Sequence, residues 1–417
     1  MALKRPLHCY NKILGFTRYK FTFAETATLK RFMKNKSVFI VSTEFLPGPG
    51  GIGSHAYQLA KELHKLGWQV TVFSEQGNCP DNEIEEFNRN SVFKVIRLFP
   101  TPSMALLLLK LFKLVWAAIT QRPGVIIGTG KHGAWFAVLT GKLTFTKTAL
   151  IGHGTEFIVT MSDRSHKINN KVFTSADALI HVSAYTRHIA ESIGVVNKNT
   201  HILHNGGDDE LFYPLPAETI EKFKQEKGLA GQKVILTVGN VQPRKGHEFV
   251  IRAMPAIVKH IPNAHYYCVG PPTIKPYLES VTHEVGATSV VHFTGRVLKD
   301  ELLLWVNACD VFVLTSVATD YGDVEGFGIV IIEAALCKKP AVVTSESGPG
   351  EAIIEGITGL GVKEKDVMGI ADKITTLLSD NTRRIEMGEK AYHNAKENLT
   401  WSKVVKKYDT ILSALIK

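Results

Sequence analysis

Two glutamates bracket a glycine turn and an apolar run in the segment VEGFGIVIIEA, residues 324–334. Glu333 stands among Ile, Val and Ala, where a carboxylate is rarely buried without a partner. If the whole stretch from Glu325 to Glu333 were helical, it would rise about 12 Å, far beyond the roughly 5 Å of a retaining-glycosidase carboxyl pair. A nucleotide sugar along the helix start could present sugar hydroxyls to Glu325 and ribose hydroxyls to Glu333, with the amides of residues 326–329 near its phosphates. The alternative is a surface acid beside a helix-capping acid.

Two cations, Arg244 and Lys245, stand in VGNVQPRKGHEF, residues 238–249. The pattern predicts a strand that ends at Gly239 and a helix that starts after Gly246. Cations at the carboxyl edge of a sheet, beside a helix N-terminus, can neutralise a diphosphate. The alternative is a pair of exposed, solubilising charges.

A glycine-rich loop, FLPGPGGIGSHAY, follows the first predicted strand, and Gly51 lies within it. Its glycines let a backbone approach a ligand closely, and the amides of a helix that opens near Ser54 would favour an anion. A tight turn without a ligand is the alternative. The spacing is not GxGxxG with an acid after the next strand, which excludes a nicotinamide site.

The elements that must position these residues alternate between β-branched runs and helical patterns, which is typical of parallel α/β sheets. In the first half the strands are SVFIVST, WQVTVFS, VFKVIRLF, GVIIGTG, TALIGHG, ALIHVS and THILHN. After a turn-rich connection, HNGGDDELFYPLP, the pattern restarts with KVILTVG, HYYCVG, VVHFTG, VFVLTS and PAVVTS. We therefore expect two Rossmann-like, doubly wound domains, 37–204 and 205–399, facing a central cleft. A C-terminal helix, 400–417, is expected to pack back on the first domain.

Length and composition agree with this division. The chain has 417 residues, 45% of them apolar and 21% charged, which suits two globular domains without a long disordered tract. Its five cysteines have no CxxC spacing, so neither a zinc site nor a disulfide framework is indicated and a reducing, cytoplasmic location fits best.

The net charge of +10 implies an anionic partner. Much of the excess lies in a basic N-terminal extension, residues 1–36, which has no apolar core or cleavage site of a secretory signal. Against the single acid Glu25 it carries Lys4, Arg5, Lys12, Arg18, Lys20, Lys30, Arg31, Lys34 and Lys36.

The segment MALLLLKLFKLVWAAI, residues 104–119, is too short to span a bilayer and is interrupted by Lys110 and Lys113. One interpretation is an amphipathic helix that lies in an anionic membrane interface with the basic extension, as a peripheral enzyme would. The other is a core helix covering the first sheet.

Taken together, the E-x7-E element, the PRKG turn, the glycine loop and the HNG linker resemble glycosyltransferase family 4, retaining enzymes of the GT-B fold. The resemblance runs from about Ser37 to the C-terminus. It implies that Glu333 binds the donor ribose, that Glu325 binds the transferred sugar, and that Lys245 binds the diphosphate. The backbone of Val297, in FTGRV, would meet the nucleobase, and His153, in GHGTEF, would lie near the donor sugar.

The family commonly has a second phosphate-binding arginine directly after the strand-ending glycine, where this chain has Asn240. Arg244 is the candidate substitute. The predicted catalytic residues are His153, Lys245 and Glu325. The predicted donor-binding residues are Gly51, Arg244, Lys245, Val297, Glu325, Gly326, Phe327, Gly328, Ile329 and Glu333.

By resemblance, the expected activity is retaining, metal-independent transfer of a hexose from a nucleotide-sugar donor to a glycan or lipid-linked acceptor, in cell-surface polysaccharide biosynthesis. No cofactor is expected, because the nucleotide sugar is a substrate. Lys245, Arg244 and helix N-termini would stabilise the developing phosphate charge. The adjacent acids Asp208 and Asp209 are expected to form a solvated turn instead of a metal site.

Three alternatives remain. A nucleotide-sugar epimerase or hydrolase of the same fold would share the sheet pattern but is disfavoured by the E-x7-E element. A non-catalytic basic scaffold is disfavoured by the intact Glu325, Glu333 and Lys245. Nucleic-acid binding is disfavoured because aromatic residues do not interleave with the basic ones.

Overall fold

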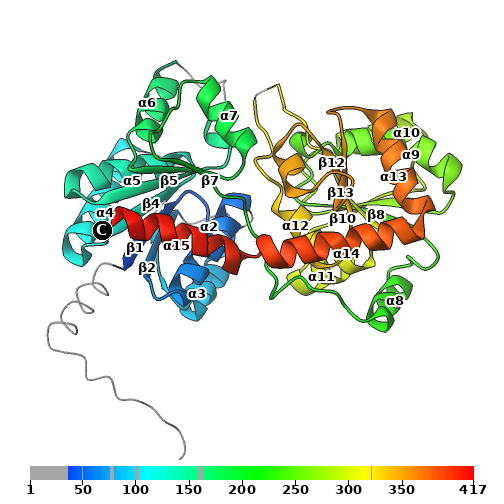
Figure 1. Cartoon of the computed structure of the whole chain (residues 1–417), viewed down its shortest axis with the longest axis horizontal. Helices are drawn as coiled ribbons and strands as arrows, with labels where there is room; N and C mark the ends of the chain where they lie inside the picture. Colours follow the sequence, from blue (N-terminus) through cyan, green and yellow to red (C-terminus); the bar gives the residue numbers. More distant parts are fainter. Residues whose placement is uncertain (1–35, 49, 76–78, 99–102, 158–162, 321) are drawn as a thin grey trace, which may run out of the picture.

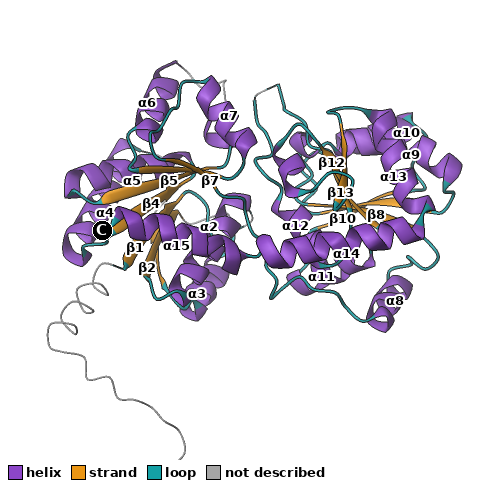
Figure 2. Cartoon of the chain, viewed as in Figure 1, coloured by secondary structure: helices purple, strands orange, loops and turns teal. Residues whose placement is uncertain are grey.

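The computed structural model describes residues 36–417 apart from 49, 76–78, 99–102, 158–162 and 321. Nearly all of the basic extension therefore lies outside the described residues. Two parallel sheets lie side by side, each with helices on both faces (Figures 1 and 2). This is the doubly wound arrangement that the alternation of strands and helices predicts.

The first sheet has the order β3-β2-β1-β4-β5-β6-β7, with every neighbouring pair parallel. Its central strands β1, β4, β5 and β6 are almost entirely buried, because helices cover both faces of the sheet. Their bounds are β1 (Ser37–Ser42), β2 (Gln69–Glu75), β3 (Lys94–Leu98), β4 (Val125–Thr129), β5 (Lys147–Gly152), β6 (Ala178–His181) and β7 (Thr200–Ile202).

Helices return the chain between these strands. They are α2 (Gly51–Lys65), α3 (Asp81–Asn90), α4 (Met104–Gln121), α5 (Lys131–Thr144), α6 (Asp163–Thr174) and α7 (Ala184–Ser192). Helix α2 begins at Gly51, earlier than the predicted start near Ser54. Glycine is a poor helix former, so its presence conceals the first turn from the sequence pattern.

The second sheet has the order β10-β9-β8-β11-β12-β13. Its strands are β8 (Lys233–Val238), β9 (Ala264–Val269), β10 (Val291–Gly295), β11 (Val311–Leu314), β12 (Ala341–Thr344) and β13 (Gly359–Val362). The sequence analysis missed β13, because its sequence GLGV is half glycine, a residue depleted in strands.

The helices of the second domain include the one that carries Glu333. Their bounds are α8 (Ala217–Glu226), α9 (His247–His260), α10 (Lys275–Glu284), α11 (Lys299–Ala308), α12 (Ile329–Leu336), α13 (Val367–Ser379) and α14 (Asn381–Asn398). Helix α12 begins at Ile329, after the glycine turn, so the stretch from Glu325 to Glu333 is not continuous helix. Gly328 caps the helix with φ of 86°, a left-handed conformation that favours glycine, and it turns the chain before the helix starts.

The last helix, α15 (Trp401–Leu415), returns to the first sheet and packs against α2. The indole of Trp68 donates a 2.7 Å hydrogen bond to Asp409. The buried ring of His55, on α2, lies 3.2 Å from the Tyr408 hydroxyl. Helices α14 and α15 thus lie end to end across both domains (Figure 1).

Helix α4 covers the first sheet with its inner side, as in the second interpretation of residues 104–119, because Leu114 and Ala118 are buried in the core of the first domain. Lys110 is only 3% exposed, and its ammonium lies 2.5 Å from the Glu75 carboxylate. The expectation that this lysine faces an interface was wrong, because β2 supplies it with a charged partner inside the domain. None of the described helices combines the length and hydrophobicity that crossing a bilayer requires.

Candidate active site

A cavity of about 660 Å³ lies between the two domains. Its walls come from the carboxyl ends of β1, β5 and β8 and from the loop before α12, which is where open parallel sheets bind ligands. The volume is in the range of small-molecule sites. Of the predicted site residues, those that line it are Gly51, His153, Arg244, Lys245, Glu325, Gly326, Phe327, Gly328, Ile329 and Glu333.

Val297 is the predicted residue that does not line the cavity. It follows β10, and its half-buried side chain packs against the apolar core. Two residues of α11 that lie just beyond it, Lys299 and Leu302, line the cavity instead. A contact between the Val297 backbone and a nucleobase stays a prediction.

The two predicted cations share one carboxylate. Lys245 Nζ lies 2.8 Å from Glu325 Oε2, and the Arg244 guanidinium contacts the same oxygen. Arg244 Nε also lies 3.3 Å from Asp323 Oδ2. Burial by itself raises the pKa of Glu325, but the charges of Lys245 and Arg244 outweigh it and hold the pKa below its usual range. Glu325 therefore pairs with the two cations that were predicted to meet the diphosphate.

The pKa of Glu333 is shifted in the opposite direction to that of Glu325. In the part of the chain that the structure describes, its carboxylate has no hydrogen bond or ion pair, although it faces the cavity from α12. Burial raises its pKa to about 8, and the nearby Asp208 adds to the effect against the opposing charges of Lys245 and Lys299. The carboxyl group is mostly protonated at neutral pH and has unused hydrogen-bonding capacity.

His153 comes from the other domain, at the end of β5. Its Nε2 lies 2.8 Å from the Thr129 hydroxyl, and its ring packs edge-on to His55. Burial lowers the pKa of His153 to about 4, so the imidazole is neutral at physiological pH. Its backbone N–H donates a 2.9 Å hydrogen bond to Glu156, a buried acid whose pKa burial raises to about 7.

His153 reaches the neighbourhood of Glu325 through Gly326. A Cβ added at Gly326 would collide with the His153 carbonyl oxygen, so only glycine permits this approach between domains. Next to it, the Ser183 hydroxyl donates a 2.7 Å hydrogen bond to the Gly326 carbonyl. The histidine and the cation-bound glutamate thus lie on facing walls of one cleft.

A second interdomain contact lies at the N-terminus of α7. The Glu351 carboxylate accepts hydrogen bonds from the backbone amides of Ala184, at 2.8 Å, and Tyr185, at 2.7 Å. The His204 ring lies 3.1 Å from the same carboxylate. A negative charge is favourable at a helix N-terminus, so this contact holds the domains together beside the cavity.

Sequence reasoning missed Glu44, which follows β1 and lines the cavity. Burial raises the pKa of its carboxyl group, while the Gly53 amide and the charge of Arg244 lower it. The available signal was an acid at the carboxyl end of the first strand, where parallel sheets bind ligands.

The acids of the linker are occupied by other side chains. Asp208 accepts a 2.5 Å hydrogen bond from Gln58, Asp209 pairs with Lys396 at 2.7 Å, and Glu210 pairs with two lysines of α2. These contacts tie the linker to α2 of the first domain and α14 of the second, whereas the sequence predicted a solvated turn. No group of three or more potential metal-ligating side chains occurs among the described residues.

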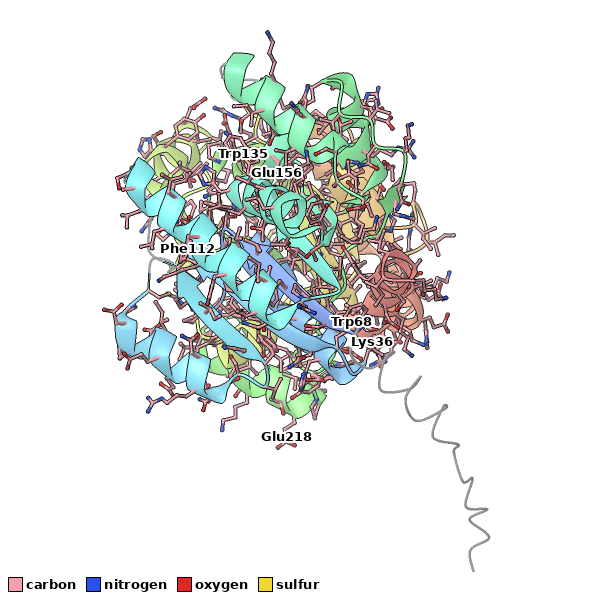
Figure 3. All side chains as sticks on the ribbon, turned by 90° about the vertical axis from the view of Figure 1, so that its left-hand side faces the viewer. Lys36, Trp68, Phe112, Trp135, Glu156 and Glu218 are labelled. Carbon is pink, nitrogen blue, oxygen red and sulfur yellow. The ribbon has the colours of Figure 1, made fainter. Side chains whose placement is uncertain are left out.

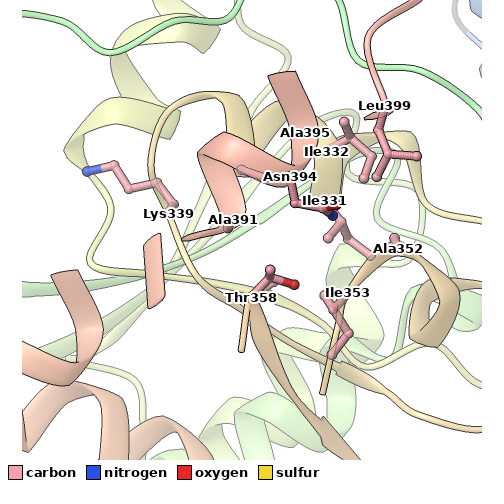
Figure 4. A pocket seen from close by; sticks show the side chains of 12 residues that line it. Ile331, Ile332, Lys339, Ala352, Ile353, Thr358, Ala391, Asn394, Ala395 and Leu399 are labelled. Atoms are coloured by element: carbon pink, nitrogen blue, oxygen red, sulfur yellow. The ribbon is translucent and has the colours of Figure 1, made fainter. Parts of the chain in front are cut away.

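A much smaller hollow, about 10 Å³, lies between α12 and α14 (Figure 4). Its walls are mainly aliphatic, with Ile331, Ile332 and Leu399 among them. Its volume is at most that of one water position, so it is a packing gap behind the wall that carries Glu333.

Comparison with known families identifies the fold and the chemistry of this cleft. The family described as Glycosyltransferase Family 4 matches residues 49–211, and the one described as Glycosyl transferases group 1 matches residues 219–394. Together the two matches extend across both domains. The chain belongs to glycosyltransferase family 4. It is a glycosyltransferase that uses a nucleotide-sugar donor.

Curated relatives of this glycosyltransferase match it over most of their length. A GDP-mannose-dependent alpha-(1-6)-phosphatidylinositol monomannoside mannosyltransferase of Mycolicibacterium smegmatis is 27% identical over 376 residues, covering 87% of this chain and 95% of the relative. The Corynebacterium glutamicum enzyme, described as acting on the monoacylated form, is 24% identical and covers 91% of this chain and 98% of the relative.

Solved structures show that the glycosyltransferase has the GT-B fold. Alr3699/HepE of Anabaena, solved in complex with UDP-glucose, has a TM-score of 0.77 at 20% identity, covering 91% of this chain and 99% of that one. WaaG, a glycosyltransferase involved in lipopolysaccharide biosynthesis, has a TM-score of 0.67 at 17% identity, covering 90% and 99%.

Proposed function

We propose that this enzyme transfers a hexose, with retention of anomeric configuration and without a metal ion, to a lipid-linked or glycan acceptor of a cell-surface polysaccharide or glycolipid. The observation that carries the proposal is the cluster of Lys245, Arg244 and Glu325 facing His153 across the cleft. The lipid-linked acceptor is supported by the names of the curated relatives, which act on phosphatidylinositol monomannoside.

In the proposed complex the donor diphosphate takes the place of Glu325 as the partner of Lys245 and Arg244. Charge-assisted contacts of this kind, with the amides at the start of α12, stabilise the negative charge that grows as the diphosphate leaves. Glu333 accepts hydrogen bonds from the ribose hydroxyls. The released Glu325 carboxylate accepts them from the transferred sugar.

Retention is proposed from the resemblance to the retaining enzymes of glycosyltransferase family 4, and a front-face reaction accounts for it without a nucleophilic carboxylate. In a front-face reaction, the bond from the anomeric carbon to the diphosphate breaks while the acceptor oxygen bonds to the same face. The acceptor proton passes to the departing diphosphate oxygen. The neutral imidazole of His153 contributes by positioning the sugar from the opposite wall.

Metal independence is proposed because Lys245 and Arg244 supply two positive charges where a metal ion would otherwise neutralise the diphosphate. The linker acids nearest the cleft are already occupied by Gln58 and Lys396. Transfer is therefore expected to continue in excess EDTA. A loss that added Mg²⁺ or Mn²⁺ restores would contradict this part of the proposal.

The purified enzyme would be supplied with GDP-mannose, UDP-glucose and other nucleotide sugars, with and without phosphoinositol mannosides or polyprenyl-linked glycans. Acceptor-dependent release of nucleoside diphosphate, with an α-linked product from an α-linked donor by NMR, is the expected result. A β-linked product would overturn retention. Sugar release or epimerisation that needs no acceptor would instead favour the hydrolase or epimerase alternative.

A further inference from the structure

The side chain of Thr129 is the hydrogen-bond partner of the His153 ring inside the first domain. Its hydroxyl lies 2.8 Å from Nε2 of the imidazole. Thr129 is completely inaccessible to solvent, whereas the His153 ring forms part of the cavity wall. Thr129 is not part of that wall. Any effect that its hydroxyl has on a bound ligand must therefore pass through His153.

The direction of this hydrogen bond follows from the partners that the hydroxyl has. A threonine hydroxyl carries one proton, and a buried proton without an acceptor is costly. Among the described residues, Nε2 of His153 is the only hydrogen-bond partner of the Thr129 hydroxyl. Burial lowers the pKa of His153 to about 4, so the ring itself carries one proton at neutral pH. The hydroxyl therefore donates to Nε2, and the proton of the imidazole is on Nδ1.

Nδ1 is the ring nitrogen that remains for a ligand. Within the described chain it makes no hydrogen bond, yet it is not one of the side-chain nitrogens that are buried without a partner. It is therefore accessible, and the ring that carries it lines the cavity. A neutral imidazole with its proton on this nitrogen is a hydrogen-bond donor, and the oxygens of a sugar are acceptors.

The backbone beside His153 is fixed by contacts of its own. Its N–H donates a 2.9 Å hydrogen bond to the carboxyl group of Glu156. The Glu156 carbonyl accepts a 2.7 Å bond from the Asn169 amide, whose oxygen accepts a 3.1 Å bond from the Trp135 indole. Glu156 and Trp135 are labelled in Figure 3, which looks onto this side of the first domain. These contacts hold the loop in place but do not determine how the His153 ring is turned.

The orientation of the ring depends on two neighbouring side chains. The ring of His55 packs edge-on to His153, with centroids 4.9 Å apart and planes at 84°. His55 is fully buried, and its Nε2 lies 3.2 Å from the Tyr408 hydroxyl. This ring limits where His153 can lie, but a ring contact does not distinguish the two nitrogens. Thr129 makes the directional contact that does.

The sheet holds Thr129 in turn. It is the last residue of β4, and it pairs with Ser42 of β1 and Ile151 of β5. The next residue, Gly130, has φ of 73°, and a Cβ there would collide with the Thr43 hydroxyl, so only glycine permits this turn into α5. Because χ1 of a β-branched residue is restricted, the strand also fixes the direction of the Thr129 hydroxyl.

We propose that Thr129 is a positioning residue that holds His153 as the Nδ1–H tautomer, so that Nδ1 donates a hydrogen bond to an oxygen of the transferred sugar. This inference rests on the proposed function, which places the sugar against the wall that carries His153. Thr129 touches neither substrate and acts by selecting the proton position and the orientation of the ring. The opposite tautomer would present a lone pair, which bonds to a sugar hydroxyl that donates but not to a ring or glycosidic oxygen.

The activity test uses the full-length enzyme with Thr129→Val, which removes the hydroxyl but keeps the shape of the side chain, and Thr129→Ser, which retains a hydroxyl. Transfer by Thr129→Val should fall by at least about fivefold, because a buried polar atom left without a partner costs that much or more. Its affinity for nucleoside diphosphate, measured by calorimetry, should stay at the wild-type value. Thr129→Ser should recover most of the rate.

The matched control is Thr140→Val. Thr140 is another fully buried threonine of the first domain, and its hydroxyl has no hydrogen-bond partner in the described chain. Removing this hydroxyl should leave the transfer rate unchanged. Equal losses of transfer in Thr140→Val and Thr129→Val would mean that the rate responds to any change in the core of this domain, and the positioning role would be rejected.

A double-mutant comparison separates positioning from a general loosening of the domain. If Thr129 acts through His153, Thr129→Val/His153→Ala should be no slower than His153→Ala, because the ring that Thr129 positions is absent. Losses that multiply would overturn the inference, as would wild-type transfer by Thr129→Val beside an impaired His153→Ala. Wild-type transfer by His153→Ala would instead contradict the role of this histidine in the proposed function, and with it the contact to the sugar.

Nuclear magnetic resonance measures the tautomer directly and needs no substrate. Long-range proton–nitrogen spectra of protein with nitrogen-15 histidine show which ring nitrogen carries the proton, and the signals absent from His153→Ala identify this ring. The proton should be on Nδ1 in the wild type and in Thr129→Ser, and a larger share should be on Nε2 in Thr129→Val. A proton on Nε2 in the wild type would overturn the inference whatever the activities of the variants.

Discussion

Lys245 Nζ lies 2.8 Å from Glu325 Oε2, and this single carboxylate also contacts the Arg244 guanidinium. The three residues come from loops after β8 and β11, two neighbouring strands of the second sheet. A diphosphate that binds here must compete with Glu325 for both cations. We therefore expect the glutamate to lower the affinity of the site for phosphate while keeping the cations in place.

Glu325→Gln is therefore expected to act in opposite directions on binding and turnover. Affinity for free GDP or UDP should rise, because the phosphates no longer displace a charged partner. Transfer should fall by roughly 10- to 150-fold, the range for a lost hydrogen bond to a charged group. Titration calorimetry and initial rates measure the two effects. The control is Asp323→Asn, because Asp323 contacts Arg244 but not Lys245. Its effects on diphosphate affinity and on transfer should be smaller. Weaker diphosphate binding by Glu325→Gln would refute the competition.

Glu333 should give nucleotide binding a pH dependence. Its pKa is about 8. Because the charged carboxylate accepts hydrogen bonds from two ribose hydroxyls best, nucleotide binding should release a proton. Affinity then rises with pH up to about 8 and levels off above it. Calorimetry in buffers of different ionisation enthalpy would count the protons released.

Glu333→Gln is the matched control for that titration, because the nucleotide phosphate also ionises near neutrality in both proteins. The variant should bind nucleotide about 10- to 150-fold more weakly at pH 8. The part of the pH dependence due to residue 333 should disappear. Identical profiles for the two proteins would place the ribose elsewhere.

His153→Ala is expected to reduce transfer much more than nucleotide affinity, because this side chain lies on the wall opposite the second domain. A loss of roughly tenfold or more corresponds to one hydrogen bond in a closed site. Because burial holds the pKa of His153 near 4, the wild-type rate should show no ionisation of this ring between pH 5.5 and about 8. Equal losses of affinity and rate in the variant would assign His153 a different place.

Glu351→Gln should weaken closure of the two domains. Burial by itself raises the pKa of Glu351. His204 and the amides of Ala184 and Tyr185 together have the larger, opposite effect, so the pKa lies below its usual value. The stabilisation is therefore present above the unfolded pKa and is lost as the pH falls through the lower folded value. Small-angle scattering should show a larger radius of gyration for the variant at pH 7.

The control for closure is Glu355→Gln. The Glu355 carboxylate accepts a 2.6 Å hydrogen bond from the Gly361 amide, within the second domain. It should leave the radius of gyration unchanged. If both variants scattered like the wild type, the contact at α7 would not govern closure.

The sequence by itself determined the alternation of strands and helices and the motifs at the strand ends. Most of the buried parallel strands are short apolar runs. Arg244 and Lys245 lie in the loop after such a run, and Glu325 lies in the loop that leads into the apolar helix α12, so local pattern indicates the ligand-binding edge. Where glycine interrupts the pattern, as in β13 and the first turn of α2, the same reasoning missed the element. The glycine turn before α12 lies where the sequence places it, with Gly328 as the residue before the helix.

Only the tertiary structure decided which of these residues meet. Arg244 reaches Glu325 because β8 and β11 are neighbours in the sheet. The strands β9 and β10 lie between them in the sequence, so local sequence does not reveal that the two are adjacent. Lys110 is buried because Glu75, on another element, supplies a counter-charge. His153 approaches Gly326 only through the packing of one domain on the other. Contacts between distant segments depend on strand order and domain packing, which arise from the summed burial of the whole chain, whereas local spacing determines only the elements themselves.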